Sequence, residues 1–558
     1  MKKIYKAFVA AALVVPALLT TGCIEEVFPT NGATQEQLNG NAKATEALVW
    51  AMPAHMNQVF TVPNEQHWDW GKGAIMHGLD CMTADMAIVY SSYNHFNTWC
   101  AANIGLNDGY LVCQFIWNFQ TEQVLTANKV VGAIDPDTTD PDLMAYLGQG
   151  LAFRASTYLD MARMYEFLPN NYVPATNTFG NDVTGYTVPI VTDKTTEEQA
   201  RNNPRAKHDE MVKFIRTDLE QAIPLLQKGT ARTSKTVPNL GVCYGLMARL
   251  YLWDATYHEQ GLPYAGEGTA AELYQKAAQY ARLAISTSNA TPMTQNEALN
   301  TQSGFNDLSV SSWMWGMQLT DEDNAVKTSI INWVSWMSNE TSFGYASAGP
   351  MVMIGANVYR RINDRDWRKL MFIAPTSSPL SGRESLINEE QRKDLPTYAS
   401  LKFRPGKGNI DDYKVGAVVG IPLMRVEEMY FIEAEATAHT NPTGGLELCT
   451  SFMQKFRYAT YRSNASTPED IIDEIVFQKR VELFGEGQAY YDYKRLNMSV
   501  DRTYSGTNFN WGRDTYNSVG RPSWMNYVIT QQETDANRAL EKWNNPNVGG
   551  KQSVLTGQ

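Results

Sequence analysis

Residues Leu143–Phe167 read LMAYLGQGLAFRASTYLDMARMYEF, and this stretch decides the fold. Its apolar residues recur at steps of three and four positions, which places them on one face of an α-helix. Pro141 and Asp142 stand at its start, where a proline and an acid are favoured, and Pro169 follows its end. The stretch therefore predicts a helix with one apolar face, which must be buried against other elements. The residues of that face are Leu143, Leu147, Leu151, Ala155, Tyr158, Ala162 and Tyr165.

Similar patterns predict further helices at 207–226, where Pro224 should distort or end the helix, at 240–257 and at 273–286. A second group is predicted at 422–439, opened by Pro422, at 446–461 and at 469–484. These segments resemble antiparallel helix pairs of the tetratricopeptide type, in which each pair buries its face against the next. We therefore predict an all-α dominated fold built from such pairs.

Between 289 and 420 the helical periodicity fades, and Trp, Gly, Ser and Asn become frequent. Loops, short helices and small hairpins are expected there. Because no long Gly/Ser- or Pro-rich linker interrupts the chain, residues 42–558 are predicted to form a single domain. Its helical repeat scaffold covers about 143–287 and 421–495, and irregular, loop-rich insertions at about 60–110 and 289–420 are laid over it.

The N-terminus has the pattern of a signal peptide at 1–22. Three lysines precede an apolar run, Ala7–Leu19, that is too short to span a bilayer. The run ends in Leu19-Thr20-Thr21-Gly22-Cys23, which resembles a lipobox. Cys23 is therefore predicted to carry the acyl chains of an outer-membrane anchor, followed by a tether at 23–41. The alternative is ordinary signal-peptidase cleavage with a free Cys23 thiol.

Charge and cysteine usage exclude several classes of protein. Without Lys2, Lys3 and Lys6, 44 basic residues remain against 59 acidic ones, which leaves a net charge of about −15. This balance argues against nucleic acid as a partner and against a polyanion held by charge alone. The other cysteines form no CxxC motif and are far apart, so separate buried thiols are favoured, with one bridge among the first three as the alternative. They are Cys81, Cys100, Cys113, Cys243 and Cys449.

Two C-terminal stretches, IPLMRVEEMYFIEAEA at Ile421–Ala436 and QKRVELFGEGQAYYDYKR at Gln478–Arg495, resemble the SusD/RagB family of nutrient-binding outer-membrane lipoproteins. The segment Gly150–Pro169 is similar to a third family motif. The resemblance implies a helical fold with four tetratricopeptide-like pairs and a ligand face built by insertions. It also implies a partner, a TonB-dependent, SusC-like barrel on which the lipoprotein sits as a lid. Glu25 and Glu26 behind the anchor look like the family's export signal to the cell surface.

The charged residues inside these motifs are expected to pair between helices, because buried charges need partners. We assign them to the scaffold rather than to chemistry. They are Arg425, Glu428, Glu433, Glu435, Arg480, Glu482, Glu486, Asp492 and Arg495.

Aromatic residues outside the helical pattern are the candidates for ligand contact, because flat rings stack on the apolar face of a sugar. They gather at 67–99 and at 313–345, interleaved with amides and acids. For any single one, burial in the core is the alternative. The favoured ligand residues are Trp333, Trp336 and Tyr345 from the second region and Tyr90, Tyr93 and Trp99 from the first.

Catalytic and metal signals are weak. No GxSxG, HExxH or P-loop motif occurs, and His67, His77 and Cys81 lack the spacing of a metal site. A calcium site in the acidic run 134–142 is an alternative, although the run lacks the glycine turn of an EF-hand loop. We therefore predict no cofactor and no enzyme, but a surface protein that binds an oligosaccharide or polysaccharide and delivers it to the transporter. The alternatives are a surface glycosidase, a peptide-binding member of the same family and a structural lid without a ligand.

Overall fold

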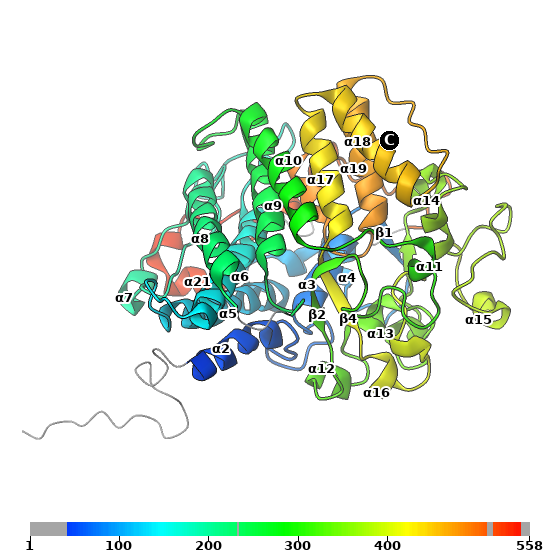
Figure 1. Cartoon of the computed structure of the whole chain (residues 1–558), viewed down its shortest axis with the longest axis horizontal. Coiled ribbons are helices and arrows are strands. Elements are labelled where there is room, and N and C mark those ends of the chain that lie inside the picture. Colours follow the sequence, from blue (N-terminus) through cyan, green and yellow to red (C-terminus); the bar gives the residue numbers. More distant parts are fainter. Residues whose placement is uncertain (1–41, 231–233, 510–516, 548–558) are drawn as a thin grey trace, which may run out of the picture.

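The computed structural model describes residues 42–230, 234–509 and 517–547. The predicted signal peptide (1–22), the anchor Cys23 and the tether (23–41) lie outside the described residues. Helices dominate the described chain (Figure 1), which confirms the predicted all-α class. The longer helices are α2 (Ala42–His55), α3 (Lys72–Cys81), α5 (Leu111–Gly132), α6 (Pro141–Tyr165), α8 (His208–Lys228), α9 (Leu240–Glu259), α10 (Ala270–Thr287), α17 (Val426–Ala438), α18 (Pro442–Phe456) and α19 (Pro468–Glu482).

Short α-helices, six 3₁₀ helices and four strands complete the described elements. The short helices are α4 (Asn97–Cys100), α7 (Glu197–Ala200), α11 (Gln295–Ala298), α12 (Asn324–Lys327), α13 (Trp333–Met337), α14 (Ala356–Arg361), α15 (Glu389–Lys393), α16 (Tyr413–Gly416), α20 (Ala489–Arg495) and α21 (Gln531–Ala536). The strands are β1 (Met86–Ile88), β2 (Trp313–Gln318), β3 (Val352–Ile354) and β4 (Gly420–Arg425). Most of these short elements fall in the two segments that the sequence predicts as insertions.

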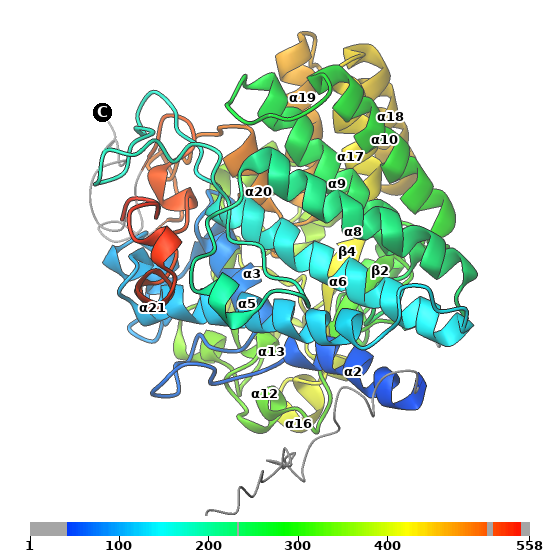
Figure 2. The same cartoon turned by 90° about the vertical axis from the view of Figure 1, so that its left-hand side faces the viewer.

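The long helices stack in an order that follows the chain. Helix α5 packs against α6, α6 against α8, α8 against α9, and α9 against α10 (Figure 2). Helix α10 then packs against α17, which also contacts α18 and α19. The contact between α10 and α17 therefore joins the two helical groups across the irregular segment between them.

Helix α6 forms where the periodicity predicts it. Asp140 caps its start, because its carboxylate accepts hydrogen bonds from the backbone N–H groups of Asp142 (2.9 Å) and Leu143 (3.2 Å). Helix α8 runs on to Lys228, so Pro224 does not end the helix, and that part of the prediction is wrong. Pro224 lies on the exposed side of the helix, where the carbonyl that loses its donor can face water.

Strand β4 corrects a second expectation. Pro422 does not open a helix; it lies in β4, opposite Gly316 of β2 in an antiparallel pair, and α17 begins only at Val426. A proline has no N–H for a sheet, but a two-stranded sheet with register shifts leaves room for a missing donor. Residues 439–441 separate α17 from α18, which begins at Pro442, four positions before the predicted start at 446.

Buried ion pairs hold the C-terminal helices together. Arg425 pairs with Glu486 at 2.8 Å and with Glu482 at 3.1 Å, and Arg457 reaches Glu482 at 2.7 Å; all four side chains are buried. The prediction that the charged motif residues belong to the scaffold is thereby confirmed for this group. Comparable buried pairs are Arg249–Glu428, Arg480–Asp85, Lys479–Asp492 and Arg495–Glu435.

The five cysteines of the described chain are buried thiols and none of them forms a disulfide, as favoured from their spacing. Burial raises the pKa of Cys113, Cys243 and Cys449, which keeps these thiols protonated at neutral pH. Within residues 42–230, 234–509 and 517–547, no helix has the length and apolar character to span a membrane.

Candidate ligand face

The two predicted insertions meet at a small sheet. Strand β1 pairs antiparallel with β3, with Met86 opposite Ile354. Beyond the strands, the N–H of Val89 donates to the carbonyl of Met351 at 2.9 Å, and the hydroxyl of Ser91 donates to the carbonyl of Ala348 at 3.2 Å. The sheet therefore places residues 89–96 directly beside residues 345–351, although about 260 positions separate them in the sequence.

Two tyrosines project from this junction into solvent. Tyr90 and Tyr93 are each 57% exposed, which is far more than the other aromatic residues predicted to contact ligand. Ser91 fixes the turn between them, because its hydroxyl accepts a hydrogen bond from the N–H of Tyr93 at 3.1 Å. The turn thus presents two large rings to water without covering them.

Two histidines lie in the same junction. The rings of His67 and His95 stack with centroids 4.5 Å apart and planes 11° apart. The hydroxyl of Tyr345 hydrogen-bonds to Nδ1 of His67, and the Tyr345 ring meets His95 edge-on at 5.2 Å. Burial, and secondly the neighbouring His67, lower the pKa of His95, so its ring is neutral at pH 7. This pair was not predicted from the sequence, because 28 positions separate the two histidines and no spacing signal joins them.

We name the exposed Tyr90 and Tyr93, together with the half-buried His67 and His95, the junction face. Tyr345 lies under it. Only 6% of Tyr345 is exposed, and Trp336 covers one face of its ring with centroids 4.3 Å apart. Tyr345 therefore supports the histidines and does not offer a flat ring.

Three of the predicted ligand tryptophans lie in the core. Trp99, Trp333 and Trp336 are at most 1% exposed, so in this structure they offer no ring face to a ligand, contrary to the expectation from the sequence. The Trp99 indole donates to the hydroxyl of Tyr527 at 3.2 Å, and Trp333 packs edge-on against Phe403 at 5.2 Å. The alternative of core burial holds for all three, and Trp336 forms the layer directly beneath the junction face.

Two family models match the chain. Residues 35–252 match one described as starch-binding, associating with the outer membrane, and residues 397–547 match that of the SusD family. The chain belongs to the SusD/RagB family. The two matches lie on either side of the irregular central segment, which carries β2, α13 and β3.

Solved structures share the fold of this SusD-family chain. A SusD-like carbohydrate binding protein from Bacteroides vulgatus is 21% identical, with a TM-score of 0.68 over 90% of this chain and 97% of its own. Surface glycan-binding protein A from Bacteroides thetaiotaomicron, solved in complex with laminarihexaose, is 15% identical, with a TM-score of 0.60 over 89% and 98%. No curated protein matches the chain in sequence.

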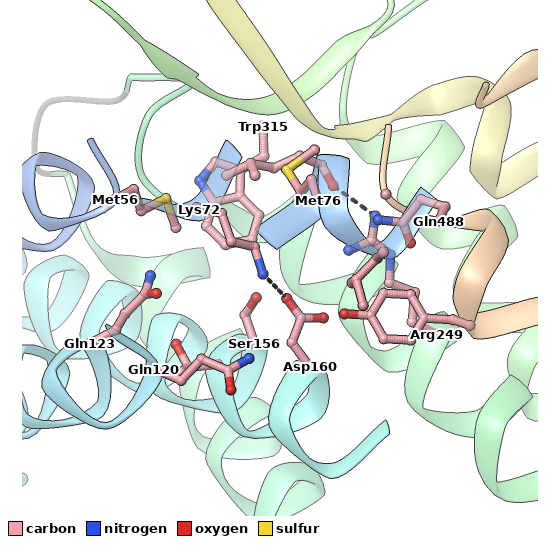
Figure 3. A pocket seen from close by; sticks show the side chains of 15 residues that line it. Met56, Lys72, Met76, Gln120, Gln123, Ser156, Asp160, Arg249, Trp315 and Gln488 are labelled. Atoms are coloured by element: carbon pink, nitrogen blue, oxygen red, sulfur yellow. Dashed lines mark hydrogen bonds and ion pairs between the residues drawn. The ribbon is translucent and has the colours of Figure 1, made fainter. Parts of the chain in front are cut away.

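A polar cavity in the interior of this SusD-family chain is too small for a sugar. Its volume of about 20 Å³ holds about one water molecule. Lys72 points across it to Asp160, with Nζ and Oδ2 2.5 Å apart, while Gln120, Arg249 and Gln488 line its other walls (Figure 3). The side-chain oxygen of Gln120 has no hydrogen-bond partner among the described residues, so it is a natural acceptor for such a water.

The acidic run 134–142 has a local role. The carboxylate of Asp135 accepts from the N–H of Asp137 at 2.9 Å, and Asp140 caps α6. Within the part of the chain that the structure describes, no three His, Cys, Asp or Glu side chains are grouped to hold a metal ion.

Proposed function

We propose that this SusD-family chain binds an oligosaccharide or polysaccharide on the junction face. The observation that carries the proposal is the pair Tyr90 and Tyr93, each 57% exposed on a turn that is hydrogen-bonded to the other insertion. Two large rings exposed on one turn form a patch that a ligand can cover. A sugar ring has an apolar face that stacks on such rings while its hydroxyl groups keep their hydrogen bonds.

The polar groups of the junction face suit a neutral glycan. The His95 ring is neutral at pH 7, and a neutral imidazole both donates and accepts a hydrogen bond. The buried stack of Trp336 on Tyr345 fixes the position of the histidines, so little side-chain entropy is lost on binding. The fold relatives named as carbohydrate binding and bound to laminarihexaose support a glycan over a peptide.

The bound glycan is then delivered to a TonB-dependent, SusC-like outer-membrane transporter, which the stacked helices contact. Cys23 carries the lipid anchor, and the chain lies on the cell surface without hydrolysing its ligand. The family matches support this placement, because one family description names association with the outer membrane.

Affinity electrophoresis against a panel of neutral polysaccharides (β-1,3-glucan, starch, xylan and mannan) tests the binding step. The double variant Tyr90→Ala/Tyr93→Ala should bind about thirtyfold more weakly than the parent protein, since each of the two lost ring contacts is worth about 1 kcal/mol. Tyr172→Ala is the matched control, because Tyr172 is 54% exposed on another loop.

Equal retardation of the double variant and the control on every glycan would refute the junction face as the ligand site. Sustained release of reducing sugar by the purified protein would replace the proposal with a glycosidase. Binding to a peptide library without binding to any glycan would replace it with a peptide-binding function.

A further inference from the structure

A second group of exposed rings lies on segments that the junction face does not use. Tyr186 and Trp543 stack with centroids 5.4 Å apart and planes 27° apart, and Tyr264 meets Tyr186 edge-on at 5.9 Å. Trp543 is 37% exposed and Tyr264 is 39% exposed. We name Tyr186, Tyr264 and Trp543 the corner platform.

Three distant segments form the corner platform. Tyr186 lies between α6 and α7, Tyr264 between α9 and α10, and Trp543 after α21. Figure 2 shows α21 beside the loops that follow α6. The amide groups of Asn177 and Asn181 donate to the carbonyl of Lys542 at 2.9 and 2.8 Å, which clamps the residue next to Trp543.

A buried arginine fixes the backbone under the rings. Arg205 is 3% exposed and donates to the carbonyls of Tyr186 (2.5 Å) and Trp543 (2.8 Å). It also donates to the carbonyl of Thr187 (2.7 Å) and to the side-chain oxygen of Asn545 (2.8 Å). These acceptors are neutral oxygens, so the charge is buried to hold backbone in place. Burial lowers the pKa of Arg205 to about 9, which still leaves it charged at neutral pH.

The third ring is also held in a constrained position. Tyr264 has φ of +61°, a region that non-glycine residues rarely adopt. Its carbonyl accepts from the N–H of Asp209 at 3.2 Å, and the ammonium group of Lys207 lies 4.2 Å from its ring centroid. The fold therefore keeps a large side chain where a glycine would relieve the backbone, and it leaves that ring exposed.

We propose that the corner platform is a second carbohydrate-binding surface, which takes one or two sugar units of a neutral polysaccharide by stacking on Trp543 and Tyr264. Its rings are rigid and exposed, which keeps the entropy cost of binding low. Lys207 supplies N–H donors for sugar hydroxyl groups beside Tyr264. Two weak sites on one chain bind a long polymer more tightly than a short oligosaccharide, because the second contact is intramolecular.

The variants Trp543→Ala and Tyr264→Ala test this proposal on the same polysaccharide panel, in the full-length protein. Each should weaken polysaccharide binding by about three- to tenfold. Removal of the Trp543 side chain leaves its carbonyl bonded to Arg205, so the loop should keep its conformation; circular dichroism and thermal unfolding check this point. If Trp543→Ala unfolds, Tyr264→Ala carries the test alone, and Tyr172→Ala remains the control.

The double variant of the junction face separates the two proposals. If both sites bind glycan, the variant Tyr90→Ala/Tyr93→Ala keeps residual binding. Adding Trp543→Ala to this double variant should remove the residual binding. If the junction double variant binds as the parent does while Trp543→Ala binds more weakly, the junction site is refuted and the corner platform stands. The corner platform is overturned if both of its variants match the Tyr172→Ala control on every glycan, or if the parent protein binds none of them.

Discussion

The buried imidazole of His208 should make the stability of the chain fall as pH rises through 9. His208 is fully buried; its Nδ1 lies 2.6 Å from Glu166 and its Nε2 lies 3.1 Å from Asp254. Burial alone would lower the pKa of His208, but the charge of Glu166 and hydrogen bonds to Asp254 and Glu166 outweigh it and raise the pKa from 6.5 to about 9. At 1.36 kcal/mol per pKa unit, this difference stabilises the fold by about 3 kcal/mol.

The direction of this pH dependence of stability follows from the raised pKa of His208. The folded state binds the proton more tightly than the unfolded chain does, so the stabilisation is complete below pH 6.5 and is lost as pH rises through 9. Urea unfolding of the parent and of His208→Gln, each at pH 6 and pH 9.5, isolates this group, because residues that titrate alike in both proteins cancel. The parent should lose about 3 kcal/mol more than the variant between the two pH values. A difference that stays constant to within about 0.5 kcal/mol would show that His208 is neutral when folded, and would refute the reasoning.

Two further pairs of substitutions separate the core from the surface. Trp336→Ala should lower the free energy of unfolding by about 3–5 kcal/mol, because it empties the layer under Tyr345. Substitution of the exposed Tyr93 by Ala should change it by less than about 0.5 kcal/mol. Equal effects of the two substitutions in urea unfolding would contradict the burial of Trp336. Arg425→Met should cost about 3–5 kcal/mol, because it removes the buried cation that Glu482 and Glu486 share. Arg201→Met, which breaks an exposed pair with Glu197, should cost less than about 1 kcal/mol, and similar losses for both arginines would mean that burial adds nothing.

The sequence predicts the long helices well because their signal is local. The apolar face of α6 repeats every three to four residues, and Pro141 with Asp142 marks its start within the same few positions. The prediction for Pro422 is wrong because the signal that decides its structure is not local. A proline at the start of a helix and a proline in a two-stranded sheet look alike in sequence, and the partner strand at Trp313–Gln318 lies more than 100 positions away.

The predicted ligand residues show the same difference between a local and a distant signal. Tyr90 and Tyr93 lie among serines and an asparagine in a turn, so their exposure follows from local composition. Trp333 and Trp336 also stand in a polar, loop-rich segment, but they sit in α13, which packs its indoles against rings from the other insertion, such as Trp70 and Phe96. Whether a tryptophan in a loop is core or surface depends on which distant segment covers it, and one sequence does not contain that information.

Buried arginines link the scaffold to both candidate surfaces. Arg502, which is fully buried, donates to the backbone carbonyls of Thr83 (2.6 Å) and Cys100 (2.6 Å), and these residues flank the segment that carries Tyr90 and Tyr93. Arg205 likewise donates to the backbone carbonyls of Tyr186 and Trp543 in the corner platform. A guanidinium has five donors in a fixed plane, so one side chain can hold several loop carbonyls that no helix or sheet would satisfy. Loops fixed in this way can keep aromatic rings exposed in one orientation, which is the property that a stacking surface for sugars requires.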